Sequence, residues 1–135
     1  MTITGTIATT SPDCQGDRFT EECLQGMATH DLRVVAIEQD PLPSAHESRR
    51  WFEAASEGRP ARVVGTATLY DTVDGDYIRR LVEQRCLFFA LCGHVAAVDG
   101  RQENGVREIR RVSNTSVMLT RFPIGDQEPV VEVQA

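Results

Sequence analysis

Six segments rich in β-branched and aromatic residues recur along the chain, with turn-forming residues between them. They occupy residues 2–8, 32–39, 61–71, 86–95, 106–123 and 129–134. Short segments of this composition, bounded by Gly, Pro, Asn and Asp, are typical of β-strands. The pattern therefore predicts a sheet-forming chain, in which residues 106–123 make one long strand or two broken ones.

Three further segments predict helices, at residues 20–30, 44–58 and 77–85. Thr20 can cap the first helix, because its hydroxyl can accept a hydrogen bond from a free backbone N–H of the first turn. In the second segment Ser44 and Glu47 have the spacing of a capping box, and Gly58 would end the helix. Strands and helices mixed in this way over 135 residues predict one strand-rich α+β domain, residues 1–135.

The composition narrows the class of protein. Hydrophobic residues make up 41% of the chain and charged residues 25%, as in ordinary globular proteins. The apolar runs are too short to span a membrane, and the start "MTITGTIATT" lacks the basic and apolar regions of a secretory signal. We therefore expect no membrane association.

The formal net charge is −6, from 20 acidic residues against 14 basic ones, and every basic residue is an arginine. Arginine pairs at 49–50, 79–80 and 110–111 are spread among acidic residues. Nucleic-acid binding requires clustered positive charge that displaces counterions. This distribution argues against direct nucleic-acid binding and favours solvated faces or protein contacts.

The possible metal ligands do not form a strong motif. The cysteines are Cys14, Cys23, Cys86 and Cys92, with no C-x-x-C pair, which disfavours a structural zinc site. We expect reduced and mostly buried thiols. Asp13 and Asp17 in "PDCQGD" could hold a divalent cation, but no further acids follow at EF-hand spacing, so a plain turn is favoured. No cofactor is expected.

The order of four stretches resembles a known family. "TTSPDCQGDRFTEECLQGMA" resembles a strand that leads through a D-x-x-G-D loop into a helix, and "RVVAIEQDP" a strand that ends in a histidine. "YIRRLVEQRCLFFALCGHV" resembles a helix and a strand ending in Leu-Ser-x-Gly, and "NGVREIRRVSNTSVMLTRFP" resembles the closing strands. Together they are similar to the prohead (capsid-maturation) proteases of tailed phages, which share the herpesvirus-protease barrel. The resemblance implies an antiparallel β-barrel with two to three helices, and the helix at 44–58 departs from it.

Proteases of this family are expected to use a serine nucleophile, a histidine base and an acidic partner. Carried over position by position, the resemblance puts Gln39 at the base, Leu91 at the nucleophile and Ser116 at the acid. A glutamine amide cannot accept a proton near neutral pH, and leucine carries no nucleophile. The resemblance thus implies a fold of this family without its catalytic triad.

Cys92 and His46 are the fallback nucleophile and base. Cys92 lies one residue beyond the nucleophile position, and a thiol needs only a lowered pKa to react. A shift of one residue along a strand directs the side chain to the opposite face, whereas His94, two residues on, shares the face of Cys92. We interpret these two residues as a buried thiol beside a partly buried histidine, and His46 as a helix-surface residue. A capsid-maturation peptidase that uses Cys92 is the alternative.

The resemblance implies a non-catalytic virion protein of a tailed phage, either a capsid decoration (cement) subunit or a capsid-assembly subunit. The implied partners are the major capsid protein, other virion proteins and further copies of the chain, in the virion and in the host cytoplasm during assembly. Aromatic residues and arginine are enriched at interface anchors. The candidate contacts are therefore Arg49, Arg50, Trp51, Phe52, Arg121 and Phe122, with core packing an equal interpretation for Trp51 and Phe52. A small-molecule-binding barrel of bacterial origin is a further alternative.

Overall fold

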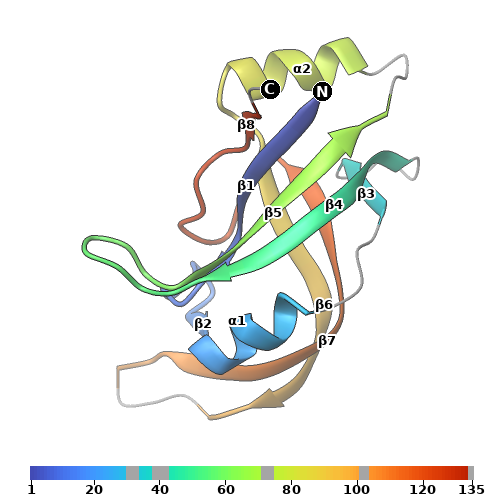
Figure 1. The fold of residues 1–135 in the computed structure, drawn as a ribbon. Coiled ribbons are helices and arrows are strands. Elements are labelled where there is room, and N and C mark those ends of the chain that lie inside the picture. The colour runs from blue at the N-terminus through green and yellow to red at the C-terminus, as the bar shows by residue number, and fades with distance from the viewer. Residues whose placement is uncertain (30–33, 38–42, 71–74, 101–103, 134–135) are drawn as a thin grey trace.

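The computed structural model describes residues 1–29, 34–37, 43–70, 75–100 and 104–133, which form the strand-rich α+β fold that the sequence predicts (Figure 1). The strands are β1 (Thr2–Thr9), β2 (Asp17–Phe19), β3 (Val34–Ile37), β4 (Pro43–Glu53), β5 (Arg62–Leu69), β6 (Phe88–Val98), β7 (Arg107–Thr120) and β8 (Val131–Glu132). The helices are α1 (Glu21–Met27) and α2 (Gly75–Glu83).

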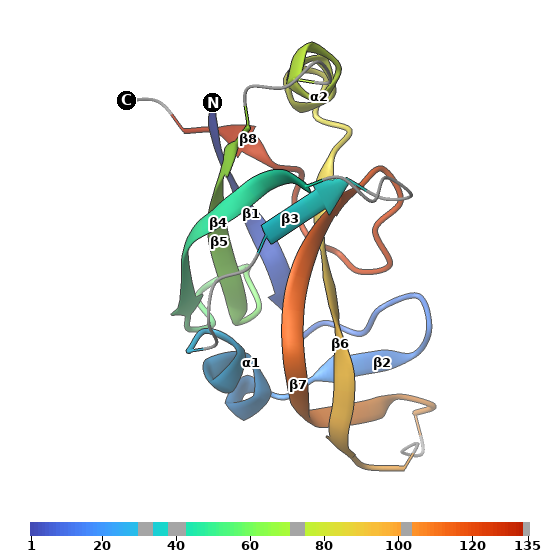
Figure 2. The same ribbon diagram turned by 90° about the vertical axis from the view of Figure 1, so that its right-hand side faces the viewer.

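The eight described strands form one curled sheet, which Figures 1 and 2 show from two sides. Its order is β2-β7-β3-β4-β5-β1-β8, and β6 pairs with β7. Most neighbouring strands are antiparallel, but β2 and β3 run parallel to β7. The expected closed antiparallel barrel is not formed: the sheet curls into a half-barrel, and no ladder among the described strands joins β6 to β1.

The C-terminal segment, residues 121–133 after β7, lies where a ladder between β6 and β1 would otherwise close the barrel. The Gln127 side-chain amide donates to the carbonyl oxygen of Phe89 at 2.9 Å, and the Val130 N–H donates to the carbonyl oxygen of Leu87 at 2.8 Å. Just beyond, β8 pairs with β1. Loop hydrogen bonds therefore connect the first part of β6 to the β1 edge.

The helix predicted at residues 44–58 is wrong, because this segment forms β4 and the turn after it. β4 has an antiparallel ladder on each side, with β3 and with β5. Gly58, at φ 77°, lies in the tight turn closed by reciprocal hydrogen bonds between Ser56 and Arg59. The capping-box spacing is a local signal, and pairing on both sides together with burial of Ala45 outweighs it.

The other two predicted helices are confirmed: α1 is shorter than the predicted residues 20–30, and α2 lies two residues before the predicted 77–85. Thr20 caps α1, since its hydroxyl accepts a hydrogen bond from the Cys23 N–H at 3.2 Å. On α2, Ile78 faces the core, whereas the neighbouring Tyr77 is 47% exposed. Neither described helix has the length and apolar composition needed to cross a membrane.

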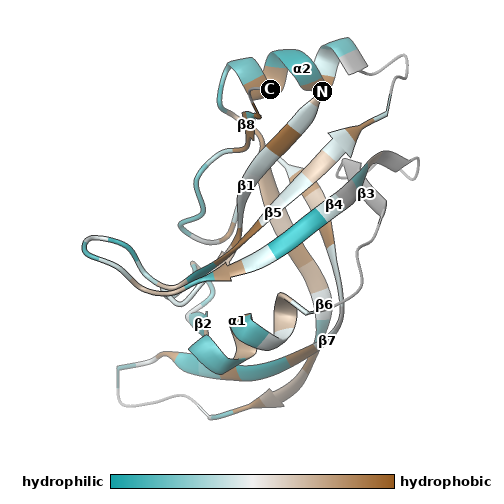
Figure 3. Ribbon diagram, viewed as in Figure 1, coloured by the Kyte–Doolittle hydropathy of each residue, from teal (hydrophilic) through white to brown (hydrophobic). Residues whose placement is uncertain are grey.

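The core lies inside the curl of the sheet. Its largest fully buried side chains are Ile3, Leu24, Met27, Ile78, Leu87, Phe89 and Leu119. They come from β1, β6, β7, both helices and the turn before β6. In Figure 3 β1 carries a brown, hydrophobic stretch, whereas the middle of β4 is teal and hydrophilic. α2 covers one end of the curl and α1 packs near the other, against β7 and β5 (Figure 1).

Candidate functional site

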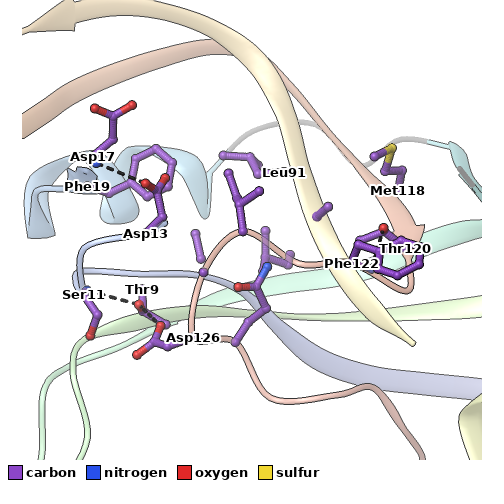
Figure 4. Close-up of a pocket in the computed structure, with 16 residues that line it drawn as sticks. Thr9, Ser11, Asp13, Asp17, Phe19, Leu91, Met118, Thr120, Phe122 and Asp126 are labelled. Carbon is purple, nitrogen blue, oxygen red and sulfur yellow. Dashed lines mark hydrogen bonds between the residues drawn. The ribbon is translucent and has the colours of Figure 1, made fainter. Parts of the chain in front are cut away.

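A pocket of about 260 Å³ opens beside the gap between β1 and β6. Four parts of the chain line it: the end of β1, the loop and strand from Ser11 to Phe19, the paired strands β6 and β7, and the loop from Phe122 to Gln127. Its apolar walls are formed by Ile7, Phe19, Leu91, Met118, Phe122 and Ile124. Figure 4 shows Leu91 between the side of the pocket that holds Asp13 and the side that holds Phe122.

The polar rim of this pocket is held in place by local hydrogen bonds. The Thr9 hydroxyl donates to Oδ1 of Asp126 at 2.6 Å and accepts from the Ser11 N–H at 3.1 Å (Figure 4). Oδ1 of Asp13 accepts from the N–H groups of Gln15 and Asp17, at 2.8 and 3.1 Å. The rim therefore has fixed acceptors around an apolar interior.

The stretch "PDCQGD" forms a hydrogen-bonded turn. Asp13 holds the turn together, and both carboxylate oxygens of Asp17 accept from Arg107 at 2.9 Å. Within the described parts of the chain, no three His, Cys, Asp or Glu side chains are grouped so that they could hold a metal ion. These carboxylates serve the local structure.

The structure describes two of the three positions that the resemblance assigns to a triad. Leu91 lies on β6 opposite Val117 and lines the pocket, while Ser116 lies on β7 opposite Cys92. Gln39 lies outside the described residues. Leu91, at the position aligned with the family's nucleophile, thus contributes an aliphatic side chain to the wall of the pocket.

Cys92 lies on the other face of β6 from Leu91, as the alternation along a strand predicts. It is half-buried, and His94 on the same strand is exposed, so the expectation of a buried thiol beside a partly buried histidine is wrong. The expectation of mostly buried thiols is also wrong: all four cysteines are free, but only Cys23 is buried. β6 and β7 shift register between Cys92 and His94, and most residues of β6 beyond this point are exposed.

His46 and Cys92 do not meet. His46 lies on β4, beside the ring of Tyr70 at 5.6 Å between centroids, and not on a helix surface. Strands β3 and β7 lie between β4 and β6. With neighbouring strands about 4.8 Å apart, three spacings separate the two residues by about 14 Å, far beyond hydrogen-bond reach.

The interface candidates on β4 have different environments. Arg50 is buried, at 7% exposed, where Nη1 donates to the Thr115 hydroxyl at 3.0 Å, so it is unsuited to contact a partner. Phe52 packs against the core, whereas Trp51 lies on the opposite, outer face of β4. Arg49 is exposed with its guanidinium 4.8 Å from the Trp51 ring centroid.

Arg121 and Phe122, the remaining interface candidates, are both exposed. Phe122 is 74% exposed at the pocket mouth, and the Arg121 guanidinium lies 5.9 Å from its ring centroid. Large exposed apolar side chains are informative when they gather in one place. Ile124, 47% exposed, lines the same pocket.

The open edge of β6 is a feature that sequence reasoning missed. Val95 and Val98 are 49% and 38% exposed, opposite the buried residues Val112 and Ile109 of β7. Among the described strands, β6 has a ladder with β7 alone, so its other edge is open beyond the contact with Gln127. The signal was the absence of charge from residues 86 to 98 except at His94, which is unusual for an edge strand.

No family model matches the sequence, and no curated protein or solved structure matches it in the two further comparisons.

Proposed function

We propose that this chain is a non-catalytic subunit of a tailed-phage capsid, either a decoration (cement) protein or an assembly subunit, with a degenerate prohead-protease fold. Its partner in this proposal is the major capsid protein or another virion protein. The proposal starts from the resemblance of the four sequence stretches, and the geometry of the pocket and its surroundings supports it.

The observation that carries the proposal is the position of Leu91. The pocket meets β6 at this residue, which the resemblance aligns with the family's nucleophile, and at the neighbouring Ala90. Neither aliphatic side chain supplies a nucleophile, and Cys92 is not among the residues that line the pocket. The pocket is therefore equipped to accept an apolar side chain and not to cleave a peptide.

The helix predicted from the sequence at residues 44–58 departed from the order of elements in the family, and the structure has the strand β4 in its place. The family continues through strands where the sequence predicts a helix, and residues 43–53 do form a strand. This agreement supports the resemblance on which the proposal depends.

The binding surface in this proposal is the pocket mouth together with the open edge of β6, and we call it the β6 surface. It contains Leu91, Val95, Val98, Phe122 and Ile124. An exposed strand edge can pair with an extended segment of another protein, and a neighbouring pocket can receive one of its side chains. This combination fits a binding subunit that works through its interface and needs no cofactor.

The test is quantitative mass spectrometry of purified mature particles, combined with the intact mass of the chain. We expect many intact copies in a fixed ratio to the major capsid protein. Absence from mature particles, or fragments produced by self-cleavage, would contradict the proposal. If Cys92→Ala then abolished such cleavage without unfolding the chain, the peptidase alternative would replace it.

A pair of variants tests the β6 surface itself. Phe122→Ala combined with Ile124→Ser should lower the copy number in particles, because both side chains are exposed at the pocket mouth. Tyr77→Ala is the matched control: Tyr77 is as exposed as Ile124, but it lies on α2, which does not line the pocket. Equal incorporation of both variants would mean that the capsid contact lies elsewhere.

A further inference from the structure

A second hollow lies on the outer face of the sheet, apart from the β6 surface. Its volume is about 570 Å³, within the range of roughly 300–1,000 Å³ of ligand pockets. β1, β5 and β4 form its floor, and Arg85 and the segment from Glu128 to Val131 form its sides. Two smaller hollows share Arg62 with it, and we call the three together the groove.

The floor of this groove presents a prearranged set of polar groups around one indole ring. Trp51, the single tryptophan of the chain, lines the groove from β4. Arg62 is held in place by a hydrogen bond to Oε2 of Glu53 at 2.9 Å and another to the Thr6 hydroxyl at 3.3 Å. Glu128 approaches Arg62 from the other side, at 3.8 Å. Carboxylate acceptors, guanidinium donors and an aromatic surface therefore line one cavity.

Arg85 is the unusual residue of the groove. It follows α2 at φ 56°, and among the described non-glycine residues it alone has a positive φ. The Arg85 N–H donates to the Val82 carbonyl and the Cys86 N–H to the Leu81 carbonyl, a helix end at which glycine is the favoured residue. An arginine in this conformation is strained, and strain of this kind is concentrated at functional sites.

The Arg85 guanidinium adds a positive charge that the described residues of the groove do not neutralise. Arg62 and Arg59 form ion pairs with Glu53 and Glu128, but Arg85 forms none with any described residue. Its side chain is exposed at the wall of the cavity. The groove thus offers a cation to a ligand that lies beside the indole ring of Trp51.

We propose that this groove binds an acidic saccharide. The Arg49 guanidinium lies 4.8 Å from the Trp51 ring centroid, so the apolar face of a sugar ring would lie against the part of the indole that lines the groove. The sugar hydroxyls would donate to Glu53 and Glu128, and a carboxylate or sulfate would pair with Arg85. Guanidinium recognises such anions through paired, charge-assisted hydrogen bonds. This binding does not depend on the capsid proposal.

Nucleic acid is the competing ligand class, since an aromatic ring beside arginine can also bind a base and a phosphate. The groove argues against it. Glu53 and Glu128 line the groove as hydrogen-bond acceptors, and so favour a ligand that carries many hydroxyl donors. Every ring of a saccharide supplies such hydroxyls, whereas a DNA strand has no free hydroxyl along its sugar–phosphate chain.

Trp51 fluorescence tests the proposal directly, because the chain has no other tryptophan. The probes are a short oligogalacturonate, a neutral galacto-oligosaccharide of the same length and an oligothymidylate. We expect a saturable change in emission with the oligogalacturonate alone. No saturable change with it, or equal or tighter binding of the oligothymidylate, would overturn the proposal.

Arg85→Gly separates binding from folding. Glycine relieves the backbone strain, so this variant should unfold at the same or a higher temperature, yet bind the oligogalacturonate ~10- to 100-fold more weakly. Arg79→Gln is the control, since it removes one charge from α2 without touching the groove. Undiminished binding by Arg85→Gly, or the same loss in Arg79→Gln, would overturn the assignment.

Discussion

Arg107 and Asp17 form a two-pronged ion pair that joins β2 to β7. Nε of Arg107 donates to Oδ1 of Asp17 and Nη2 donates to Oδ2, each at 2.9 Å. The Asp17 side chain is only 10% exposed, and its hydrogen bonds and negative charge raise the pKa of the Arg107 guanidinium. The short strand β2 has only three residues, and this pair adds a side-chain link to the backbone ladder that joins it to β7.

Asp17→Asn should lower the free energy of unfolding, because a neutral amide cannot accept both charged hydrogen bonds of Arg107. Chemical denaturation with urea measures the effect. Glu108→Gln is the matched control, since it breaks the more exposed Arg18–Glu108 pair of the same two strands. The interpretation fails if Glu108→Gln is as destabilising as Asp17→Asn.

Arg50 holds α1 against β7, and its loss should be costly. Nη1 donates to the Thr115 hydroxyl at 3.0 Å and lies 3.4 Å from the carbonyl oxygen of Met27, at the end of α1. Arg50→Ala removes both of these buried hydrogen bonds and opens a cavity, so we expect a loss of about 2–4 kcal/mol of stability.

Arg49→Ala is the control for this change, because it removes an exposed arginine from the next position of β4. Its expected cost is below about 1 kcal/mol, the size of an exposed cation–π contact. Thermal unfolding compares the two variants. Similar losses in both would show that Arg50 is not part of the buried structure.

Local patterns in the sequence predict most of the elements. Dense β-branched residues predict β1, β5 and β7, and the Thr20 cap predicts the start of α1. They fail at β4, because the capping-box spacing of Ser44 and Glu47 describes only neighbours in sequence. The ladders with β3 and β5 are formed by residues far away in the chain.

The candidate site depends even more on distant contacts. Leu91 lines a pocket because the C-terminal segment folds back over β6. No local pattern in the sequence predicts this long-range contact. The burial of Arg50 depends on α1 and Thr115, and the hollow beside Trp51 depends on Arg85 and Glu128. One feature of the site does follow from the sequence: side chains alternate along a strand, so those of Leu91 and Cys92 are predicted to lie on opposite faces of β6.

Cys23 should make stability depend on alkaline pH. Burial raises the pKa of its thiol from 9.0 to about 11, and the nearby Glu22 carboxylate adds to the rise. The fold therefore favours the protonated thiol. This contribution is complete below pH 9 and is lost as the pH rises toward about 11, by roughly 2–3 kcal/mol in total.

The measurement is the free energy of unfolding of the wild type and of Cys23→Ala, below pH 9 and near pH 11. The difference between them should shrink as the pH rises, and the absence of lysine leaves few other groups that titrate in this range. Cys14→Ala, which removes an exposed thiol, should retain the pH dependence of the wild type. A constant difference for Cys23→Ala would contradict the buried, protonated state.

Gly5 allows the C-terminal segment to approach β1 and the start of β6. A Cβ atom at this position would lie 2.8 Å from Cγ1 of Val130 and 3.2 Å from Cδ2 of Phe89. The backbone of Val130 is also close, at 3.3 Å from its Cα, so the neighbours cannot move aside by rotation of one side chain. Gly5→Ala should therefore cost about 1–3 kcal/mol of stability through overpacking.

Gly26→Ala is the opposite case and serves as its control. Gly26 lies in α1, and a Cβ atom added there would meet nothing within 4 Å, so alanine should stabilise the fold by about 0.5–1 kcal/mol. Urea denaturation measures whether each substitution lowers or raises the free energy of unfolding. Because Val130 donates to the Leu87 carbonyl beside Phe89, a neutral Gly5→Ala would mean that the C-terminal segment does not pack across the gap between β1 and β6. The pocket at Leu91 would then lack the wall that the segment from Phe122 to Gln127 supplies.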